Sequence, residues 1–367
     1  MGHLERLGIR PFLNAHDTIT LYGGSRMAEN TLEAMGEIAG CFVEVQELQR
    51  ILGAHIARLT RNEGAYITNC AAGGIQLAAA VCLAKGDPYR YRHLPKVPDG
   101  RNEILVLHAQ HNCYGKSIEA AGGVVRLVGD ADEALAFDLE ASLTDRVAAL
   151  FYFPNALYER GSLPLETVCE IAHGKGIPVV VDAAAQLPPV ENLWNFAKAG
   201  ADLVIFSGGK TLCGPQDSGL IVGKKRYIED CLRFGAPEHG ICRGSKVSRE
   251  SMIGLTVAIE NYLATDHAAH GAALSRMVDR LVQTMEESGK VKPWRVERGS
   301  VGQSYPRAFG QMQTSAGVAA LRDNLRAQGV FIGADERLKQ IYFSVLNLTE
   351  AECETVCLRL KEALASL

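Results

Sequence analysis

Two short apolar runs in the middle of the chain restrict its fold more than any other feature. The first, Val179–Val181, ends at Asp182. The second, Leu203–Phe206, ends at Ser207 and lies shortly before Lys210. Short runs rich in β-branched residues are typical of parallel strands that helices cover on both faces. Ligands of such sheets bind beyond the carboxyl ends of the strands, so we expect Asp182 and Lys210 to face one crevice.

An amine and a carboxylate at one crevice are the groups that pyridoxal phosphate requires. A lysine forms a Schiff base with its aldehyde, and an aspartate keeps its ring nitrogen protonated so that the ring accepts electrons. Lys210 also follows a sequence like the end of a phosphate-binding P-loop, but Val204 stands where that loop needs glycine. Either residue alone would suit an ordinary strand-end cap or a solvated loop lysine. The pair, with the small residues before Lys210, favours the cofactor.

Composition and charge exclude several classes of protein. The chain has 367 residues and a formal charge of -4, which argues against a surface built for nucleic acid or anionic lipid. Its 10 cysteines form no C-x-x-C pair, and nothing near Cys353 and Cys357 completes a zinc set, so we expect reduced thiols and no metal. No run is long enough to span a bilayer and no secretory signal begins the chain, which predicts a cytoplasmic protein.

Apolar periodicity predicts alternating strands and helices around the two central runs, the pattern of an α/β chain with a parallel sheet. Beyond Lys224 the pattern changes to a long amphipathic helix and a second αβ region. We therefore predict an N-terminal segment and helix (1–60), a large cofactor-binding domain (61–257) and a small C-terminal domain (258–367). The expected strands are 103–108, 124–129, 148–153, 330–333 and 340–345, and the expected helices are 30–59, 130–143, 164–175, 263–287 and 348–367.

A run of small residues precedes a predicted apolar helix. Cys70, Ala71, Ala72 and Gly73 would leave backbone N–H groups open at the helix start, where the helix dipole also favours an anion. We expect this turn to hold the phosphate of the cofactor. The same small residues would also suit close packing of the helix on a sheet.

Three further residues are candidates for contacts at the crevice. His111 follows a predicted strand, and we expect its ring to stack on the cofactor or to move a proton, although a structural histidine remains an alternative. Asn155 follows another strand and would hydrogen-bond the phenolate oxygen of the cofactor. Arg26, after Gly23 and Gly24, would bind a carboxylate or phosphate with both of its terminal nitrogens, unless it is a solvated residue of a surface turn.

Motifs along nearly the whole chain resemble fold type I pyridoxal-phosphate enzymes, in the branch of bacterial L-seryl-tRNA selenium transferase (selenocysteine synthase) and the D-glucosaminate-6-phosphate ammonia-lyases. The motifs are LNAHDTITLYGGSR, NCAAGG, VVVDAAAQ, FSGGKTLCGPQDSGLIVGK, CRGSKVSRESMIGL and VGQSYPRAFG. The lysine segment is the most specific, although Asp217 and Ser218 separate its glutamine from its glycine. The resemblance implies a large domain with a mostly parallel seven-stranded sheet, a smaller α/β domain, and a homodimer or higher homo-oligomer with shared active sites.

The resemblance also implies roles for individual residues. Lys210 would be the Schiff-base lysine, Asp182 the partner of the ring nitrogen, and Ser207 a residue near the phosphate. Gln186, at the end of VVVDAAAQ, would contact the cofactor, and Arg243 and Lys246 would bind anionic groups of the substrate or the cofactor. The selenium transferases carry an additional N-terminal domain for tRNA, whereas this chain starts almost at once with the first motif, so we expect no nucleic-acid partner.

The pair of Lys210 and Asp182, with nearby cationic residues, predicts an α,β-elimination on a small hydroxylated, anionic amino acid. Only the resemblance to the ammonia-lyases implies an aminosugar acid such as D-glucosaminate 6-phosphate as the substrate. Lys210 would remove the α-proton, the β-hydroxyl would leave, and the enamine would hydrolyse to a 2-oxo acid and ammonia. Aminotransfer, racemisation and β-replacement stay open, because they differ only in the placement of one acid. A non-catalytic binding protein of this fold would be expected to lack the lysine or the aspartate, and both are present.

Overall fold

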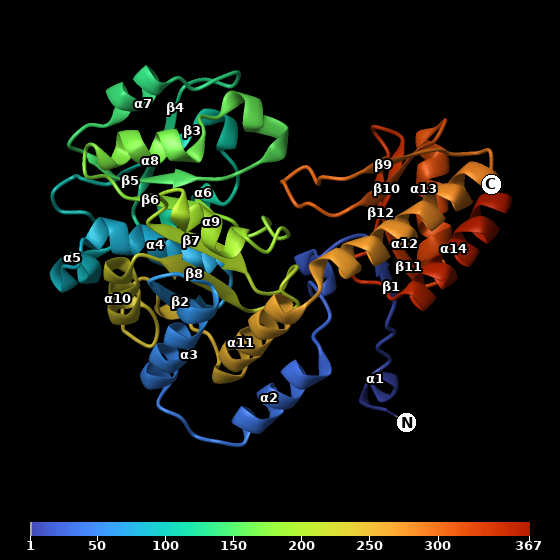
Figure 1. The fold of residues 1–367 in the computed structure, drawn as a ribbon, viewed down its shortest axis with the longest axis horizontal. Helices are drawn as coiled ribbons and strands as arrows, with labels where there is room; N and C mark the ends of the chain where they lie inside the picture. Colours follow the sequence, from blue (N-terminus) through green and yellow to red (C-terminus); the bar gives the residue numbers. More distant parts are fainter. Residues whose placement is uncertain (1) are drawn as a thin grey trace. The chain divides into compact units, whose positions relative to one another are not determined.

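The computed structural model describes residues 2–367, which form two compact units (Figure 1). The larger unit comprises 26–264 and 300–303, and the smaller comprises 2–25, 265–299 and 304–367. These units differ from the predicted ranges 1–60, 61–257 and 258–367. The first 25 residues group with the C-terminal part because strand β1 (Leu13–Ala15) pairs with strand β11 (Val330–Asp335).

A seven-stranded sheet of order β2-β8-β7-β6-β5-β3-β4 forms the centre of the larger unit (Figure 1). Strand β8 is antiparallel to both of its neighbours, and the other pairs are parallel, which confirms the predicted mostly parallel sheet. The strands are β2 (Gly64–Thr68), β3 (Glu103–Leu107), β4 (Val124–Val128), β5 (Val147–Tyr152), β6 (Val179–Asp182), β7 (Leu203–Ser207) and β8 (Gly219–Gly223).

Helices cover both faces of this sheet, which is why its central strands are continuously apolar. Val179 and Val181 face one hydrophobic core, and Val180 between them faces the other, because successive strand residues point to opposite sides. The first core includes α3 (Val45–Leu59), α7 (Ala136–Ser142), α8 (Leu165–His173), α9 (Asn192–Lys198) and α11 (Arg249–Ala264). The second includes α4 (Ala71–Ala84), α5 (Pro88–His93), α6 (Gly115–Ala120) and α10 (Lys225–Phe234).

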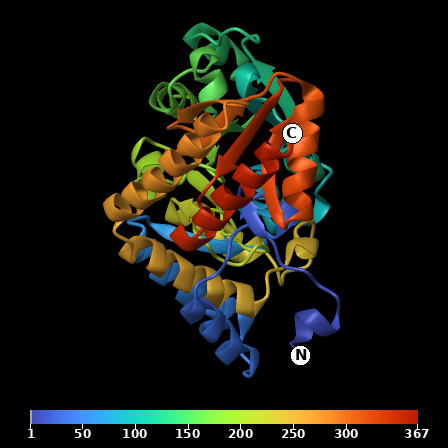
Figure 2. The ribbon, with the colours of Figure 1, turned by 90° about the vertical axis from the view of Figure 1, so that its right-hand side faces the viewer.

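The smaller unit has a five-stranded sheet of order β1-β11-β12-β10-β9. Figure 2 shows the N-terminal segment beside the C-terminal strands, where Leu13 aligns with Val330. Strands β11 and β12 and the closing helix were expected from the sequence, whereas β1, β9 and β10 were not. The elements are β9 (Lys292–Val296), β10 (Arg307–Gln311), β12 (Gln340–Ser344), α12 (His267–Glu287), α13 (Ser315–Ala327) and α14 (Glu350–Ala365).

Three predicted helices are wrong in extent because polar side chains cap the backbone at new places. The helix expected over 30–59 is two helices, α2 (Glu29–Ala39) and α3, because Glu44 accepts hydrogen bonds at the start of the second. Asp266 likewise starts α12 after α11 has ended at Ala264. Asp130 accepts from the N–H groups of Asp132 and Glu133 and forms a turn, so the helix expected over 130–143 is only α7.

A buried ionic cluster stabilises the amino edge of the large sheet. The fully buried carboxylate of Asp202 accepts from Lys224 Nζ at 2.7 Å, from the Val179 N–H at 2.8 Å and from His173 Nε2 at 2.8 Å. Burial alone would raise the pKa of Asp202, but the bonds from Lys224, Val179 and His173 outweigh it and lower the pKa.

Replacing Asp202 with asparagine is expected to lower the free energy of unfolding by about 2 to 3 kcal/mol, because the buried carboxylate and its charged hydrogen bonds to Lys224 and His173 are lost. Since its pKa is lowered, the stabilisation is present above pH 4 or so and is lost as the pH falls through the lowered value. Urea unfolding at pH 7 measures the effect, with the exposed Asp145→Asn as control. Equal stability of both variants would contradict it.

Candidate active site

The carboxyl ends of β6 and β7 bring the central predicted residues to one edge of the sheet. Asp182 aligns with Ile205 across the two strands, and Ser207 lies two residues further along β7. Lys210 follows β7 in the next loop, close enough for its charge to lower the pKa of Asp182. The amine and the carboxylate that the sequence analysis paired are therefore neighbours.

The environment of Asp182 favours a positively charged partner for its carboxylate. Burial raises its pKa, and the Ala184 N–H, 3.0 Å from Oδ1, and the charge of Lys210 oppose that rise only in part. A protonated ring nitrogen is a partner of the required charge. The chemistry of this donor set therefore fits pyridoxal phosphate.

The loop that carries Lys210 is packed too tightly for side chains larger than hydrogen at its glycines. The Gly208 N–H donates to the Ser218 carbonyl at 2.9 Å, and a Cβ at Gly208 would lie 2.0 Å from Ser218 Oγ. Thr211 Oγ1 donates to the Leu187 carbonyl at 2.9 Å on the other side of Lys210. This packing explains the small residues of the motif, because it holds the lysine at a defined position.

The first turn of α4 lies at the same edge. Cys70 is its N-cap, with Sγ 3.3 Å from the Gly73 N–H, and Ala71 and Ala72 are partly exposed. Strand register places Ser207 beside Gly219, whose missing side chain leaves room for the Cys70 backbone. A helix start of small, accessible residues near a serine suits a phosphate group.

The loop with Arg243 and Lys246 lies beside this turn. A Cβ on Gly73 would be 3.5 Å from Ser245 Cβ, and Ser245 Oγ donates to Gln76 Oε1 at 3.3 Å. Arg243 is partly buried and Lys246 is exposed. The structure thus places both cations in a loop next to the predicted phosphate seat, and their contact with substrate stays a prediction.

Tyr114 lies near Asp182 and Cys70, and the sequence analysis did not select it. Burial raises the pKa of its phenol, and the nearby acidic groups of Cys113, Asp182 and Cys70 raise it further. His111 is exposed at the end of a short 3-10 helix, and its predicted contact with the cofactor stays a prediction. The sequence feature that could have identified Tyr114 is its position, three residues after His111 in the same loop.

Two predicted amides have hydrogen bonds within the protein. Asn155 Oδ1 accepts from the Leu157 N–H at 3.0 Å and caps a short 3-10 helix. Gln186 is 6% exposed, and its Nε2 donates to the carbonyls of Pro154 at 3.0 Å and Val301 at 2.6 Å. Both amides therefore hold loops at the carboxyl edge, and their predicted contacts with the cofactor stay predictions.

The N-terminal motif lies in the smaller unit, where it meets another predicted motif. Tyr305 donates to Asp17 Oδ1 at 2.9 Å, and Arg307 lies 3.5 Å from Asp17 Oδ2. Gly23 and Gly24 have φ values of 82° and 78°, a conformation that favours glycine. Arg26 is exposed at the start of the larger unit, and its anion contact stays a prediction.

Gly219 allows a direct test of the predicted phosphate-binding site at the first turn of α4. An alanine Cβ would lie 2.6 Å from the Cys70 carbonyl carbon and would push the first turn of α4 out of place. We expect Gly219→Ala to weaken cofactor binding at least about tenfold, since helix-end hydrogen bonds to an anion depend on position. Cofactor titration measures the change. Gly36→Ala, which meets no atom within 4 Å, is the control, and equal affinity of both variants would contradict the expectation.

Comparisons with known proteins agree with this geometry. A profile of the L-seryl-tRNA selenium transferase family matches residues 115–300. D-glucosaminate-6-phosphate ammonia lyase of Salmonella typhimurium is 34% identical over 263 residues, covering 70% of this chain and 69% of that protein. A 5'-C-glycyluridine monooxygenase-decarboxylase of Streptomyces is 31% identical over 290 residues, covering 77% and 71%. A solved structure of D-glucosaminate-6-phosphate ammonia-lyase superposes with a TM-score of 0.84 at 26% identity, covering 100% of this chain and 99% of that one.

Proposed function

Because the chain belongs to the L-seryl-tRNA selenium transferase family and is a pyridoxal-phosphate-dependent lyase, we propose that it releases ammonia from a small hydroxylated, anionic amino acid. The proposed substrate class includes aminosugar acids such as D-glucosaminate 6-phosphate, and the product is a 2-oxo acid. The observation that carries the proposal is the meeting of Asp182 and Lys210 at the carboxyl edge, beside a helix start suited to phosphate.

Residues of this chain would hold the cofactor at three points. Lys210 Nζ would bind its aldehyde carbon, Asp182 would keep the proton on its ring nitrogen, and Ser207 with the first turn of α4 would bind its phosphate. When bound, the cofactor supplies an electron sink for a negative charge at the α-carbon of the substrate. Tyr114, near Asp182, would limit access of water to the ring.

The proton transfers would fall to Lys210. Its amine would take the proton from the α-carbon of the substrate. The bond from the β-carbon to the hydroxyl would then break, and the hydroxyl would leave as water with the proton that Lys210 has taken from the α-carbon. The enamine product tautomerises and takes up one water, which yields one 2-oxo acid and one ammonia.

The proposal of an anionic substrate is supported by the cations near the predicted phosphate-binding site. Arg243 and Lys246 lie in the loop beside the first turn of α4, and a guanidinium binds carboxylate or phosphate in a bidentate manner. D-glucosaminate 6-phosphate carries both of these groups. The similarity to a lyase named for that compound supports the same substrate class here.

Ammonia release tests the proposal. Purified holoenzyme is incubated with D-glucosaminate 6-phosphate, D-glucosaminate and serine, and ammonia and 2-oxo acid are measured together. We expect equal amounts of both products, with the highest kcat/KM for the phosphorylated acid. Inversion of the α-carbon without ammonia would indicate a racemase, and dioxygen consumption with decarboxylation would point to the reaction named for the 31% identical relative; either result would refute the proposal.

We also propose a homodimer or larger homo-oligomer that acts in the cytoplasm on a small molecule. Within residues 2–367, no helix combines the length and the apolar character that crossing a membrane requires. Light scattering of the holoenzyme at several concentrations would test the oligomer, and a monomer at all of them would refute it.

A further inference from the structure

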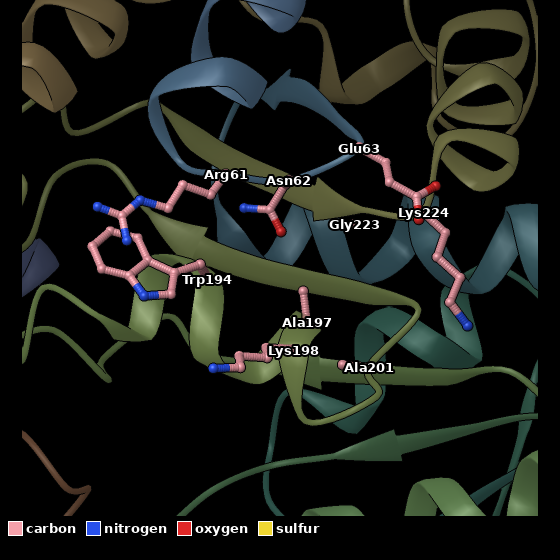
Figure 3. Close-up of a pocket in the computed structure, with 9 residues that line it drawn as sticks. All are labelled: Arg61, Asn62, Glu63, Trp194, Ala197, Lys198, Ala201, Gly223 and Lys224. Atoms are coloured by element: carbon pink, nitrogen blue, oxygen red, sulfur yellow. The ribbon is translucent and has the colours of Figure 1, made fainter.

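A pocket of about 410 Å³ opens at the edge of the large sheet opposite Asp182 and Lys210 (Figure 3). It is formed where Arg61–Glu63 lead into β2, where β8 ends at Gly223, and where α9 ends before β7. A five-residue strand such as β7 separates the two edges by on the order of 13 Å. The volume lies within the range of about 300 to 1,000 Å³ that small-molecule sites occupy.

Two cations of this pocket, Arg61 and Lys198, have no carboxylate partner among the residues that the structure describes. The Arg61 guanidinium lies 4.3 Å from the centre of the Trp194 ring, and Lys198 follows Trp194 by one helical turn on α9. Figure 3 shows both side chains at the Trp194 end of the pocket. Neither makes an ion pair with an acidic residue of 2–367, and both are exposed. An anion at this end would therefore meet positive charge on two sides.

The acidic neighbours of the pocket are engaged elsewhere. Glu63 accepts from the Lys225 N–H at 3.0 Å and caps the start of α10. Asp202 is bound to Lys224 Nζ at 2.7 Å. Within residues 2–367, neither carboxylate forms an ion pair with Arg61 or Lys198.

Asn62 supplies a buried acceptor for a ligand hydroxyl. Its Nδ2 donates to the Thr60 carbonyl at 2.7 Å and to the Leu193 carbonyl at 2.9 Å, so the amide nitrogen must face these two oxygens. Its Oδ1 consequently points the other way, and this buried atom has no hydrogen-bond partner in the described chain. Buried acceptors are usually satisfied, so an unpaired one that lines a pocket indicates a missing donor.

We infer that this pocket is a second binding site, distinct from the catalytic edge, for the phosphate monoester of a sugar or polyol. The phosphate, which carries about two negative charges at neutral pH, binds between Arg61 and Lys198. A hydroxyl of the ligand donates to Asn62 Oδ1, and its carbon skeleton packs on Trp194 and Ala197. The inference depends only on this pocket, so it can be refuted independently of the proposed lyase reaction.

Fluorescence of Trp194 tests the inference, because the chain has 2 tryptophans and Trp294→Phe leaves Trp194 as the single reporter. Holoenzyme with this substitution is titrated with D-glucose 6-phosphate, inorganic phosphate and D-glucose. We expect saturable binding of D-glucose 6-phosphate, weaker binding of phosphate that competes with it, and no response to D-glucose. No saturable change, or an equal response to D-glucose, would overturn the inference.

Removal of both cations provides the matched test. Arg61 has a φ of 55°, so Arg61→Gly suits the backbone, and it is combined with the exposed Lys198→Ala. Calorimetry is expected to show at least tenfold weaker binding of D-glucose 6-phosphate, with ammonia release from the substrate unchanged. Arg337→Ala, an exposed turn residue of the smaller unit, is the control. An unchanged dissociation constant in the double variant would refute the site.

Discussion

Replacing Lys210 with alanine is expected to reduce the rate of ammonia release at least about 10³-fold, because one amine both binds the cofactor and moves the α-proton. The loss should appear in kcat, since the proton transfer is made only in the transition state. Steady-state assays at saturating cofactor measure it. Lys175→Ala, which removes an exposed loop lysine of the same unit, is expected to retain full activity.

Covalent labelling separates the role of Lys210 from a general disturbance of the fold. Borohydride reduction of the wild-type holoenzyme, followed by peptide mapping, should place the cofactor on residue 210. The Lys210→Ala variant should bind the cofactor without such a label. Attachment at another lysine, or a purified wild-type protein without visible absorbance from the cofactor, would exclude the assigned role.

Replacing Asp182 with asparagine is expected to lower kcat by about 10² or more, because asparagine cannot hold a proton on the ring nitrogen by charge. The same substitution is expected to raise, not lower, the stability of the cofactor-free protein at neutral pH. Burial raises the pKa of Asp182, so ionisation of this carboxyl group is less favourable in the folded than in the unfolded chain. Stability then falls as the pH rises through the raised pKa, and the substitution removes that loss.

The prediction for Asp182 is checked by urea unfolding of the cofactor-free protein at pH 5 and pH 7. The asparagine variant should be at least as stable as the wild type at pH 7 and should show a smaller change between the two pH values. Asp202→Asn is the contrasting case, because the lowered pKa of Asp202 predicts lower stability with the catalytic edge intact. If Asp182→Asn destabilised the protein as much as Asp202→Asn, a structural role would replace the catalytic one.

The opposite pKa shifts of Asp182 and Asp202 could not be predicted from the sequence. Both border buried strands of the same sheet. The hydrogen bonds that lower the pKa of Asp202 come from Lys224, Val179 and His173, which lie up to 29 positions away. Asp182 accepts a hydrogen bond from the Ala184 N–H, and the charge of Lys210 lies nearby. The hydrogen bonds formed in the assembled sheet therefore explain why the pKa of Asp202 is lowered while burial raises that of Asp182.

Local patterns were sufficient to predict the central strands of the larger sheet, the pair Asp182 and Lys210 at their ends, and the helix start after Cys70, because each depends on periodicity and short-range spacing. Contacts between segments far apart in the sequence became visible only in the folded chain. Folding paired β1 with β11, seated Cys70 against Gly219, brought Tyr114 near Asp182 and opened the pocket of Arg61 and Trp194 at the opposite edge. No local pattern encodes such contacts, since they arise only when distant segments pack in register.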